Sequence, residues 1–141
     1  MQVENILQSK GRAVHTVAAD ATIGEAVAIL NSRRIGAVVV TEAGKVAGIL
    51  SERDIVRHLG KQWGDLADKP VSEVMTRDVV TMSRHATVAD VMERMTDRRI
   101  RHMPIVDNGD LVGIVSIGDV VKRKIEETEQ EALALKEYIA S

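Results

Sequence analysis

The sequence repeats itself at an interval of 65 residues, and this feature constrains the fold more than any other. Residues 14–57 align with residues 79–122 without a gap, and thirteen of the 44 aligned pairs are identical. Many of the other pairs keep apolar character in both copies. Internal repetition decides the architecture of a chain, and two copies are too few for a solenoid. The repeat therefore predicts two similar halves related by pseudo-two-fold symmetry.

Each copy predicts the same order of elements, β-α-β-β-α. Thr22 and Thr87 are expected to cap the first helix, because Glu25 and Asp90 follow three residues later as capping-box partners. A polar break with glycine, at residues 42–45 and 107–110, predicts a hairpin turn in each copy. The expected strands are 14–17, 37–41 and 46–50 in the first copy and 79–82, 103–106 and 111–115 in the second.

These elements predict an α/β fold of the α+β kind, with a helix added at the C-terminus. The expected domain limits are 1–60 for the first copy with its lead-in, 61–76 for a connector, 77–124 for the second copy and 125–141 for the C-terminal helix. Within the connector, residues 71–75 predict a short helix that leads into the second copy. Residues 3–7 are similar and are expected to lead into the first copy.

Apolar residues continue at helical spacing after the second copy. They form a seam with alternating spacings of four and three residues: Val121, Ile125, Thr128, Ala132, Leu135 and Ile139. A seam of under three heptads is too short to identify a coiled coil from sequence. Two interpretations stay open: the helix packs on its own copy, or it forms a contact in a dimer.

The composition limits the classes of function. The net charge of −2 and the pI near 6.1 argue against broad electrostatic binding of nucleic acid or an anionic membrane. The absence of cysteine excludes disulfides, thiolate zinc sites and cysteine nucleophiles. No apolar run approaches the ~20 residues of a membrane span. The N-terminus lacks the pattern of a signal peptide, so a cytoplasmic protein is expected.

Both copies carry Ser-x-x-Asp at the expected start of their second helix, Ser51 with Asp54 and Ser116 with Asp119. A helix N-terminus offers unpaired N–H groups and the positive end of the helix dipole, which suit a phosphate. A carboxylate at this point can accept hydrogen bonds from both hydroxyls of a ribose. The same pattern is also a capping box, which needs no ligand. One aspartate can serve in both ways, as a cap when the site is empty and as a ribose ligand when it is filled.

The repeat resembles a tandem pair of cystathionine-β-synthase (CBS) domains, often called a Bateman module, of the stand-alone bacterial type. Three segments carry the resemblance: GILSERD at 48–54, GIVSIGD at 113–119 and IRHMPIVD at 100–107. It covers residues 3–124. Gly48 and Gly113 lie inside expected strands, where glycine indicates close approach of backbone or ligand. The first copy departs from the pattern at Val39, which stands where the second has Pro104.

The resemblance implies two clefts between the copies that bind AMP, ADP, ATP or another adenosyl nucleotide, with no prosthetic group and no catalytic activity. It also implies pairing of modules into homodimers. For the cleft of Asp119 it assigns the phosphate side to Ser116, Arg101 and His102, and the base side to Val14, Thr16, Ile35 and Ala37. For the cleft of Asp54 it assigns Ser51 and Arg53, with Thr81 and Ile100 on the base side. Since the Arg-His pair exists only in the second copy, the Asp119 cleft is expected to bind phosphate more tightly.

The function expected from these residues is that of an adenine-nucleotide sensor that acts through an unidentified effector protein. The alternative is a ligand-independent protein that serves dimerisation or interaction only. The four histidines show no metal-binding spacing, and no glycine-rich phosphate loop is present, so neither an enzyme nor a metal site is expected.

Overall fold

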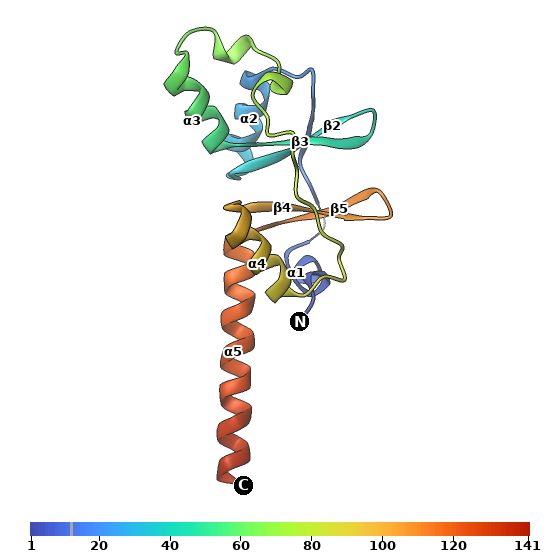
Figure 1. Ribbon diagram of the computed structural model, residues 1–141, viewed down its shortest axis with the longest axis vertical. Helices are drawn as coiled ribbons and strands as arrows, with labels where there is room; N and C mark the ends of the chain where they lie inside the picture. The colour runs from blue at the N-terminus through green and yellow to red at the C-terminus, as the bar shows by residue number, and fades with distance from the viewer. Residues whose placement is uncertain (12) are drawn as a thin grey trace. The chain divides into compact units, whose positions relative to one another are not determined.

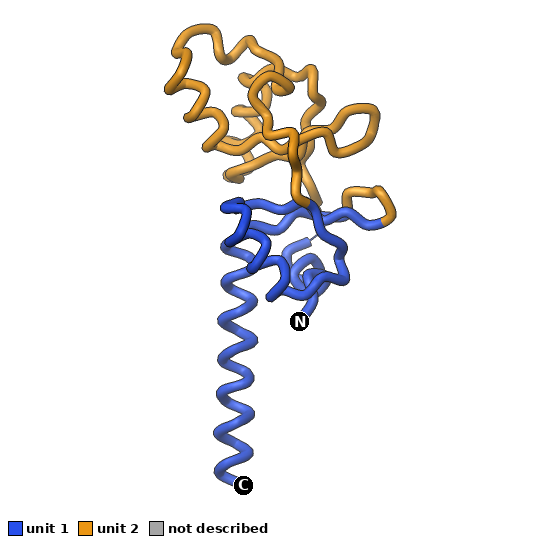
Figure 2. The backbone as a smooth tube through the Cα atoms, in the orientation of Figure 1, with its two compact units in different colours: residues 1–12, 81–107, 112–141 blue, residues 13–80, 108–111 orange. Residues whose placement is uncertain are grey.

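The computed structural model describes residues 1–11 and 13–141, which divide into two units (Figure 1 and Figure 2). Unit 1 contains the described part of Met1–Arg12 together with Thr81–Asp107 and Val112–Ser141. Unit 2 contains Ala13–Val80 and the hairpin tip Asn108–Leu111. The first copy of the repeat therefore builds unit 2, and most of the second copy builds unit 1.

Unit 2 is organised around a three-stranded sheet in the order β1-β2-β3. β1 (Thr16–Ala18) runs parallel to β2 (Ala37–Glu42), which pairs antiparallel with β3 (Lys45–Ser51). The helices are α2 (Ile23–Arg33) and α3 (Glu52–Lys61), followed by the 3-10 turns η1 (Leu66–Asp68) and η2 (Val71–Glu73). Val38, Val40 and Leu50 are fully buried beside Ile23 and Leu30, so the sheet and α2 share an aliphatic core.

Unit 1 contains α1 (Val3–Lys10), α4 (Val88–Arg98), β4 (His102–Asp107), β5 (Asp110–Ser116) and α5 (Ile117–Ala140). The strand expected at 79–82 is reduced to one parallel bridge between Met82 and Ile105. The prediction of a full strand is wrong, and the boundary between the two units falls inside this segment, after Val80. The chain beyond Met82 pairs with the N-terminus. The carbonyls of Arg84 and Ala86 accept hydrogen bonds from the N–H groups of Glu4 and Val3.

The two hairpins confirm the turns predicted at the polar breaks. Ala43 and Gly44 have φ of 52° and 77°, and Asn108 and Gly109 have 52° and 82°. Two successive positive φ values identify type I′ turns, whose twist matches that of the strands they join. The predicted N-caps are also present, since Thr22 and Thr87 accept hydrogen bonds from the backbone N–H groups three residues later.

Each lead-in segment belongs to the unit built by the other copy of the repeat. Unit 1 includes α1, although its residues lie before the first copy, and unit 2 includes η2, although it lies before the second. Gly113 in β5 faces Leu7 of α1, and Gly48 in β3 faces Met75 just after η2. A Cβ on Gly113 would lie 2.5 Å from a Leu7 methyl carbon, and one on Gly48 would lie 2.6 Å from the Met75 sulfur. Packing of the lead-ins therefore explains the close approach that these glycines predicted.

The C-terminal helix α5 extends beyond the rest of unit 1 (Figure 2). Its first turns contact α4 and α1, and Val120 there is fully buried. All residues from 128 to 141 are exposed. The interpretation that the helix packs on its own copy is therefore wrong for this second half, because no other element among residues 1–11 and 13–141 covers it.

Candidate functional site

The two Ser-x-x-Asp motifs both form capping boxes at a helix start. In the first copy, the Ser51 side chain accepts a hydrogen bond from the Asp54 N–H, and the Ser51 N–H donates to the Asp54 carboxylate. Ser116 and Asp119 form the same reciprocal pair at the start of α5. The capping interpretation of the motif is thus confirmed for both copies. The two aspartates differ in what else contacts them.

Asp54 is buried, and both of its carboxylate oxygens accept hydrogen bonds. Only 8% of its surface is exposed. Besides the Ser51 N–H at 2.9 Å, the hydroxyl of Ser51 donates to Oδ2 at 3.1 Å and the hydroxyl of Thr76 donates to Oδ1 at 3.1 Å. The Arg57 guanidinium lies 3.7 Å from Oδ1. Both carboxylate oxygens are therefore occupied by groups of unit 2 itself.

Asp119 is more open and is held by a lysine. Its side chain is 25% exposed, and the Lys10 ammonium donates to Oδ2 at 2.6 Å. The Ser116 N–H donates to the same oxygen at 2.9 Å. Lys10 also donates to the Ile114 carbonyl at 3.0 Å, so one ammonium joins β5 to the start of α5. Apart from the Ser116 N–H, the carboxylate is thus contacted by a flexible side chain of α1.

Lys10 donates a hydrogen bond to the carboxylate of Asp119, as Thr76 does to the carboxylate of Asp54 in the other copy. In unit 2, the Thr76 N–H donates to the Ile49 carbonyl at 2.9 Å, while its hydroxyl reaches Asp54. Ile49 corresponds to Ile114 in the repeat, so the Lys10 ammonium replaces both the N–H and the hydroxyl of Thr76. Thr76 is fixed by a two-bond backbone bridge to Ile49. A lysine side chain can swing away, whereas this bridge cannot move without breaking the edge of the sheet.

The environment of Asp119 favours its charged form. Burial alone would raise the pKa of this carboxyl, because it disfavours the anion. The hydrogen bond and charge of Lys10, together with the hydrogen bonds from Ser116, outweigh burial and hold the pKa below its ordinary value. Asp119 is consequently an anion and an acceptor at neutral pH.

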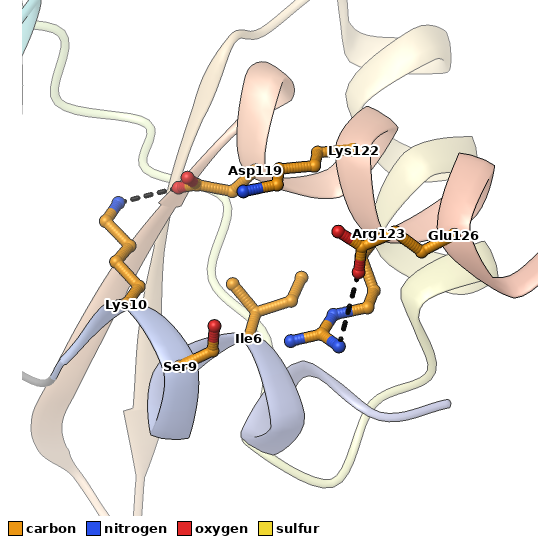
Figure 3. Close-up of a pocket in the computed structure, with 7 residues that line it drawn as sticks. All are labelled: Ile6, Ser9, Lys10, Asp119, Lys122, Arg123 and Glu126. Atoms are coloured by element: carbon orange, nitrogen blue, oxygen red, sulfur yellow. Dashed lines mark hydrogen bonds and ion pairs between the residues drawn. The ribbon is translucent and has the colours of Figure 1, made fainter.

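A pocket of about 290 Å³ opens between α1 and the first turns of α5 within unit 1. Its lining, shown in Figure 3, consists of Ile6, Ser9, Lys10, Asp119, Lys122, Arg123 and Glu126. The Arg123 guanidinium donates a hydrogen bond to the Asn5 carbonyl at 3.1 Å and forms an ion pair with the Glu126 carboxylate at 3.6 Å. Three basic against two acidic side chains give the pocket a positive balance, which suits an anionic ligand.

The remaining predicted residues divide between the two units. Unit 1 contains Thr81, Ile100, Arg101 and His102 beside Ser116 and Asp119, and the Arg101 carbonyl accepts from the Ile117 N–H at 2.8 Å. This bond fixes the Arg101 backbone at the start of α5. Unit 2 contains the others: Val14, Thr16, Ile35, Ala37, Ser51, Arg53 and Asp54. Ala37 is the register partner of Ser51 at the end of β3.

Lys10 is the site residue that sequence reasoning missed. It lies outside residues 14–57, where the repeat is detectable, and the lead-ins align with a different interval. Among the described residues, no group of acidic or histidine side chains could hold a metal ion. No helix in the described part of the chain is long and apolar enough to cross a membrane.

Comparisons with known proteins agree on the family. The CBS domain family matches residues 6–61 and 71–126. The CBS domain-containing protein YhcV of Bacillus subtilis is 38% identical over 107 residues, which are 76% of this chain and 76% of YhcV. The crystal structure of the CBS-domain containing protein ATU1752 from Agrobacterium tumefaciens has a TM-score of 0.85 at 46% identity, covering 88% of this chain and 99% of that one.

A third similar structure contains small molecules. It is the CBS domain pair of MJ0100 in complex with 5′-methylthioadenosine and S-adenosyl-L-methionine, with a TM-score of 0.79 and 28% identity. The match covers 90% of this chain and 98% of that one. The sequence repeat, the paired Ser-x-x-Asp helix starts and the fold of each unit agree with these matches. The chain belongs to the CBS domain family and contains two CBS domains in tandem.

Proposed function

We propose that this protein is a non-catalytic regulatory module that binds an adenosyl ligand through Asp119. AMP, ADP, ATP and related adenosyl nucleotides are the candidates. The observation that carries the proposal is the difference between the two aspartates. Each aspartate caps its own serine; beyond that, Asp54 is closed by Thr76, which the backbone fixes, whereas Asp119 is closed by the side chain of Lys10. The CBS pair of MJ0100 with its two adenosyl compounds supports this class of ligand.

The proposed binding step is an exchange of partners at Asp119. The ribose hydroxyls donate to the carboxylate and take the place of the Lys10 ammonium. Lys10 then turns to a negative group of the ligand, such as a phosphate, and keeps an anion as its partner. The pocket beside it already has a positive balance. Ser116, Arg101 and His102 would complete the phosphate side within unit 1.

The proposal assigns one ligand to each chain. Binding at Asp54 would require a ribose to displace Thr76, and this would break the backbone bridge between Thr76 and Ile49. Displacement of a lysine that is 36% exposed costs much less, because exposed ion pairs are worth about 0.2–1 kcal/mol. Asp54 then serves as a structural cap in the first copy.

Titration calorimetry with AMP, ATP and S-adenosyl-L-methionine tests the assignment. Hydrogen bonds to a charged group contribute about 1.5–3 kcal/mol each, so Asp119→Asn should weaken binding at least tenfold. The matched variant Asp54→Asn should keep the affinity within about threefold. If no adenosyl compound binds to the wild type, or if Asp54→Asn is the variant that loses binding, the proposal is wrong.

A second experiment tests the exchange at Asp119. Lys10→Met removes the competing ammonium but also the cation that the phosphate would contact. Adenosine, which has no phosphate, should therefore bind more tightly to Lys10→Met than to the wild type, while AMP should gain less or lose affinity. Lys45→Met, at the exposed start of β3, is the control for loss of charge. Equal effects of Lys10→Met on adenosine and AMP would contradict the exchange.

We further propose that the module works as a cytoplasmic homodimer that passes its state to a separate effector protein. Ligand would favour one arrangement by its higher affinity for that arrangement. The exposed second half of α5 also fits the alternative of a ligand-independent interaction protein. The two readings separate in thermal melts, since a bound adenosyl ligand raises Tm by mass action and an interaction protein shows no shift.

A further inference from the structure

Helix α5 presents an exposed apolar stripe between residues 121 and 139, and nothing in the described chain covers its second half. Val121 is 38% exposed, Ile125 53%, Leu135 59% and Ile139 73%. With Thr128 and Ala132 they form one continuous line along residues 121–139 of the 24-residue helix. An isolated helix of this second half would be marginal in water, because most helical stability comes from packing of the apolar face. Burial of this stripe therefore requires an apolar surface of similar length on a partner.

We propose that two copies of this chain pair through α5 as a parallel, in-register, two-stranded coiled coil. The heptad assignment follows from the spacing of the stripe. Ile125, Ala132 and Ile139 take the a positions, while Val121, Thr128 and Leu135 take the d positions. Ile125 and Ile139 at a and Leu135 at d are of the types that favour two strands, whereas Ala132, Val121 and Thr128 are not. This inference deepens the homodimer of the proposed function and does not depend on the ligand.

The charges beside the stripe select the parallel orientation. In a parallel pair, each g residue lies opposite the e residue five positions later in the other helix. Lys124 then lies opposite Glu129, and Glu131 lies opposite Lys136. Both contacts join opposite charges, and the dyad forms each of them twice. Lys136 has no acidic residue three or four positions away in its own helix, so its complement lies only across the pair.

An antiparallel pair has the opposite electrostatic outcome. There, g residues face g residues and e residues face e residues. Glu131 would face its own copy, Glu129 would face its own copy, and Lys122 would approach Lys136. Like charges at each of these contacts oppose association. The same stripe is thus compatible with both orientations by shape, but when the two stripes overlap fully, their flanking charges favour the parallel one.

The first turns of α5 are already helical and packed within each single chain. Its N-terminus is capped by Ser116, and its first turns pack on α4 and α1 of unit 1. The cost of helix nucleation is therefore already met within each chain. This allows a seam of under three heptads to associate, although a free peptide of that length would be a poor coiled coil.

Cysteine cross-linking tests the geometry, because the chain has no native cysteine. In a parallel, in-register pair, residue 132 faces its own copy across the seam. Ala132→Cys should form a disulfide-linked dimer under mild oxidation, whereas Leu133→Cys, on the outer face and 58% exposed, should not. Failure of Ala132→Cys to cross-link, or equal cross-linking of both variants, overturns the proposal.

Charge exchange tests the orientation in solution. Glu131→Lys and Lys136→Glu should each raise the dissociation constant about tenfold, because each turns two attractive contacts into repulsive ones. The double variant restores opposite charges and should recover wild-type affinity. Light scattering gives the mass, expected at twice the 15.4 kDa of one chain. Absence of recovery in the double variant refutes the parallel register.

The same measurements separate this inference from the homodimer itself. Val56→Glu changes an exposed residue of α3 in unit 2, 67% exposed, and should leave the mass unchanged. A wild type that is monomeric refutes both the homodimer and the coiled coil. A dimer that survives the α5 variants but dissociates with Val56→Glu refutes the coiled coil alone. Circular dichroism confirms that each variant remains folded.

Discussion

Replacing Gly113 by alanine should destabilise unit 1 by about 1–2 kcal/mol. The new Cβ would lie 2.5 Å from one methyl carbon of Leu7 and 3.1 Å from the other. Carbon atoms rest about 3.5–4.0 Å apart, so the Leu7 side chain, α1 or β5 must move by roughly 1 Å. Leu7 is only 1% exposed, so its side chain moves within a packed core. Overpacking of this kind costs about 1–3 kcal/mol, and loss of glycine flexibility in the unfolded chain returns about 0.4–1 kcal/mol.

Urea unfolding followed by circular dichroism measures this loss of stability. Gly60→Ala is the matched control, since a Cβ at that position in α3 meets nothing within 4 Å. It should stabilise the protein by about 1 kcal/mol, as expected for glycine to alanine inside a helix. A Gly113→Ala variant with the wild-type midpoint would refute the reasoning.

A double variant identifies Leu7 as the group that the new methyl meets. Leu7→Ala alone should cost about 2–5 kcal/mol through the cavity that it leaves. In Gly113→Ala/Leu7→Ala the added methyl fills part of that cavity. The double variant should therefore lose at least about 1 kcal/mol less than the sum of the single variants. Additive losses would show that the strain lies elsewhere.

Three further predictions concern the turns and the two aspartates. Ala43→Asn should raise stability by up to about 1 kcal/mol in urea unfolding, because asparagine tolerates the positive φ that Asn108 already adopts in the other hairpin. Asp54→Ala should cost about 2–3 kcal/mol, since it removes a buried cap and leaves its donors unpaired; a loss below 0.5 kcal/mol would contradict the saturation of Asp54. The lowered pKa of Asp119 means that its ion pair stabilises the fold above about pH 4 and that this contribution disappears as pH falls through the folded-state pKa. Lys10→Met should accordingly be less stable than the wild type at pH 7, by about 1 kcal/mol or less, and the difference should shrink as pH falls through the folded-state pKa of Asp119; a difference that does not change with pH would contradict the assignment.

The local structure could be predicted from residues that act on their near neighbours. Thr22, Ser51 and Ser116 cap their helices because the groups they bond lie within three residues. Asn108 and Gly109 fix a hairpin turn through their own φ preferences. The order of elements within each copy follows from such short-range chemistry, and the structure confirms it except at residues 79–82.

The long-range arrangement could not be predicted in the same way. The apolar residues of 3–7 indicate that this segment is buried, but hydrophobic burial has no direction and does not say on which copy. In the structure, the N-terminus pairs with Arg84 and Ala86 of the second copy. Lys10 reaches Asp119 because α1 belongs to unit 1, so the contact between Lys10 and Asp119 could not be predicted from the sequence either.

The assignment of α1 to unit 1 has a consequence during synthesis on the ribosome. The main segment of unit 2 is one continuous stretch, Ala13–Val80, which emerges as a whole. Val3 and Leu7 emerge before it, yet the strands and helices that bury them are translated only after residue 80. Val3 and Leu7 must therefore wait until the residues beyond 80 have been made, and this interval is when a nascent chain would most need protection from a chaperone.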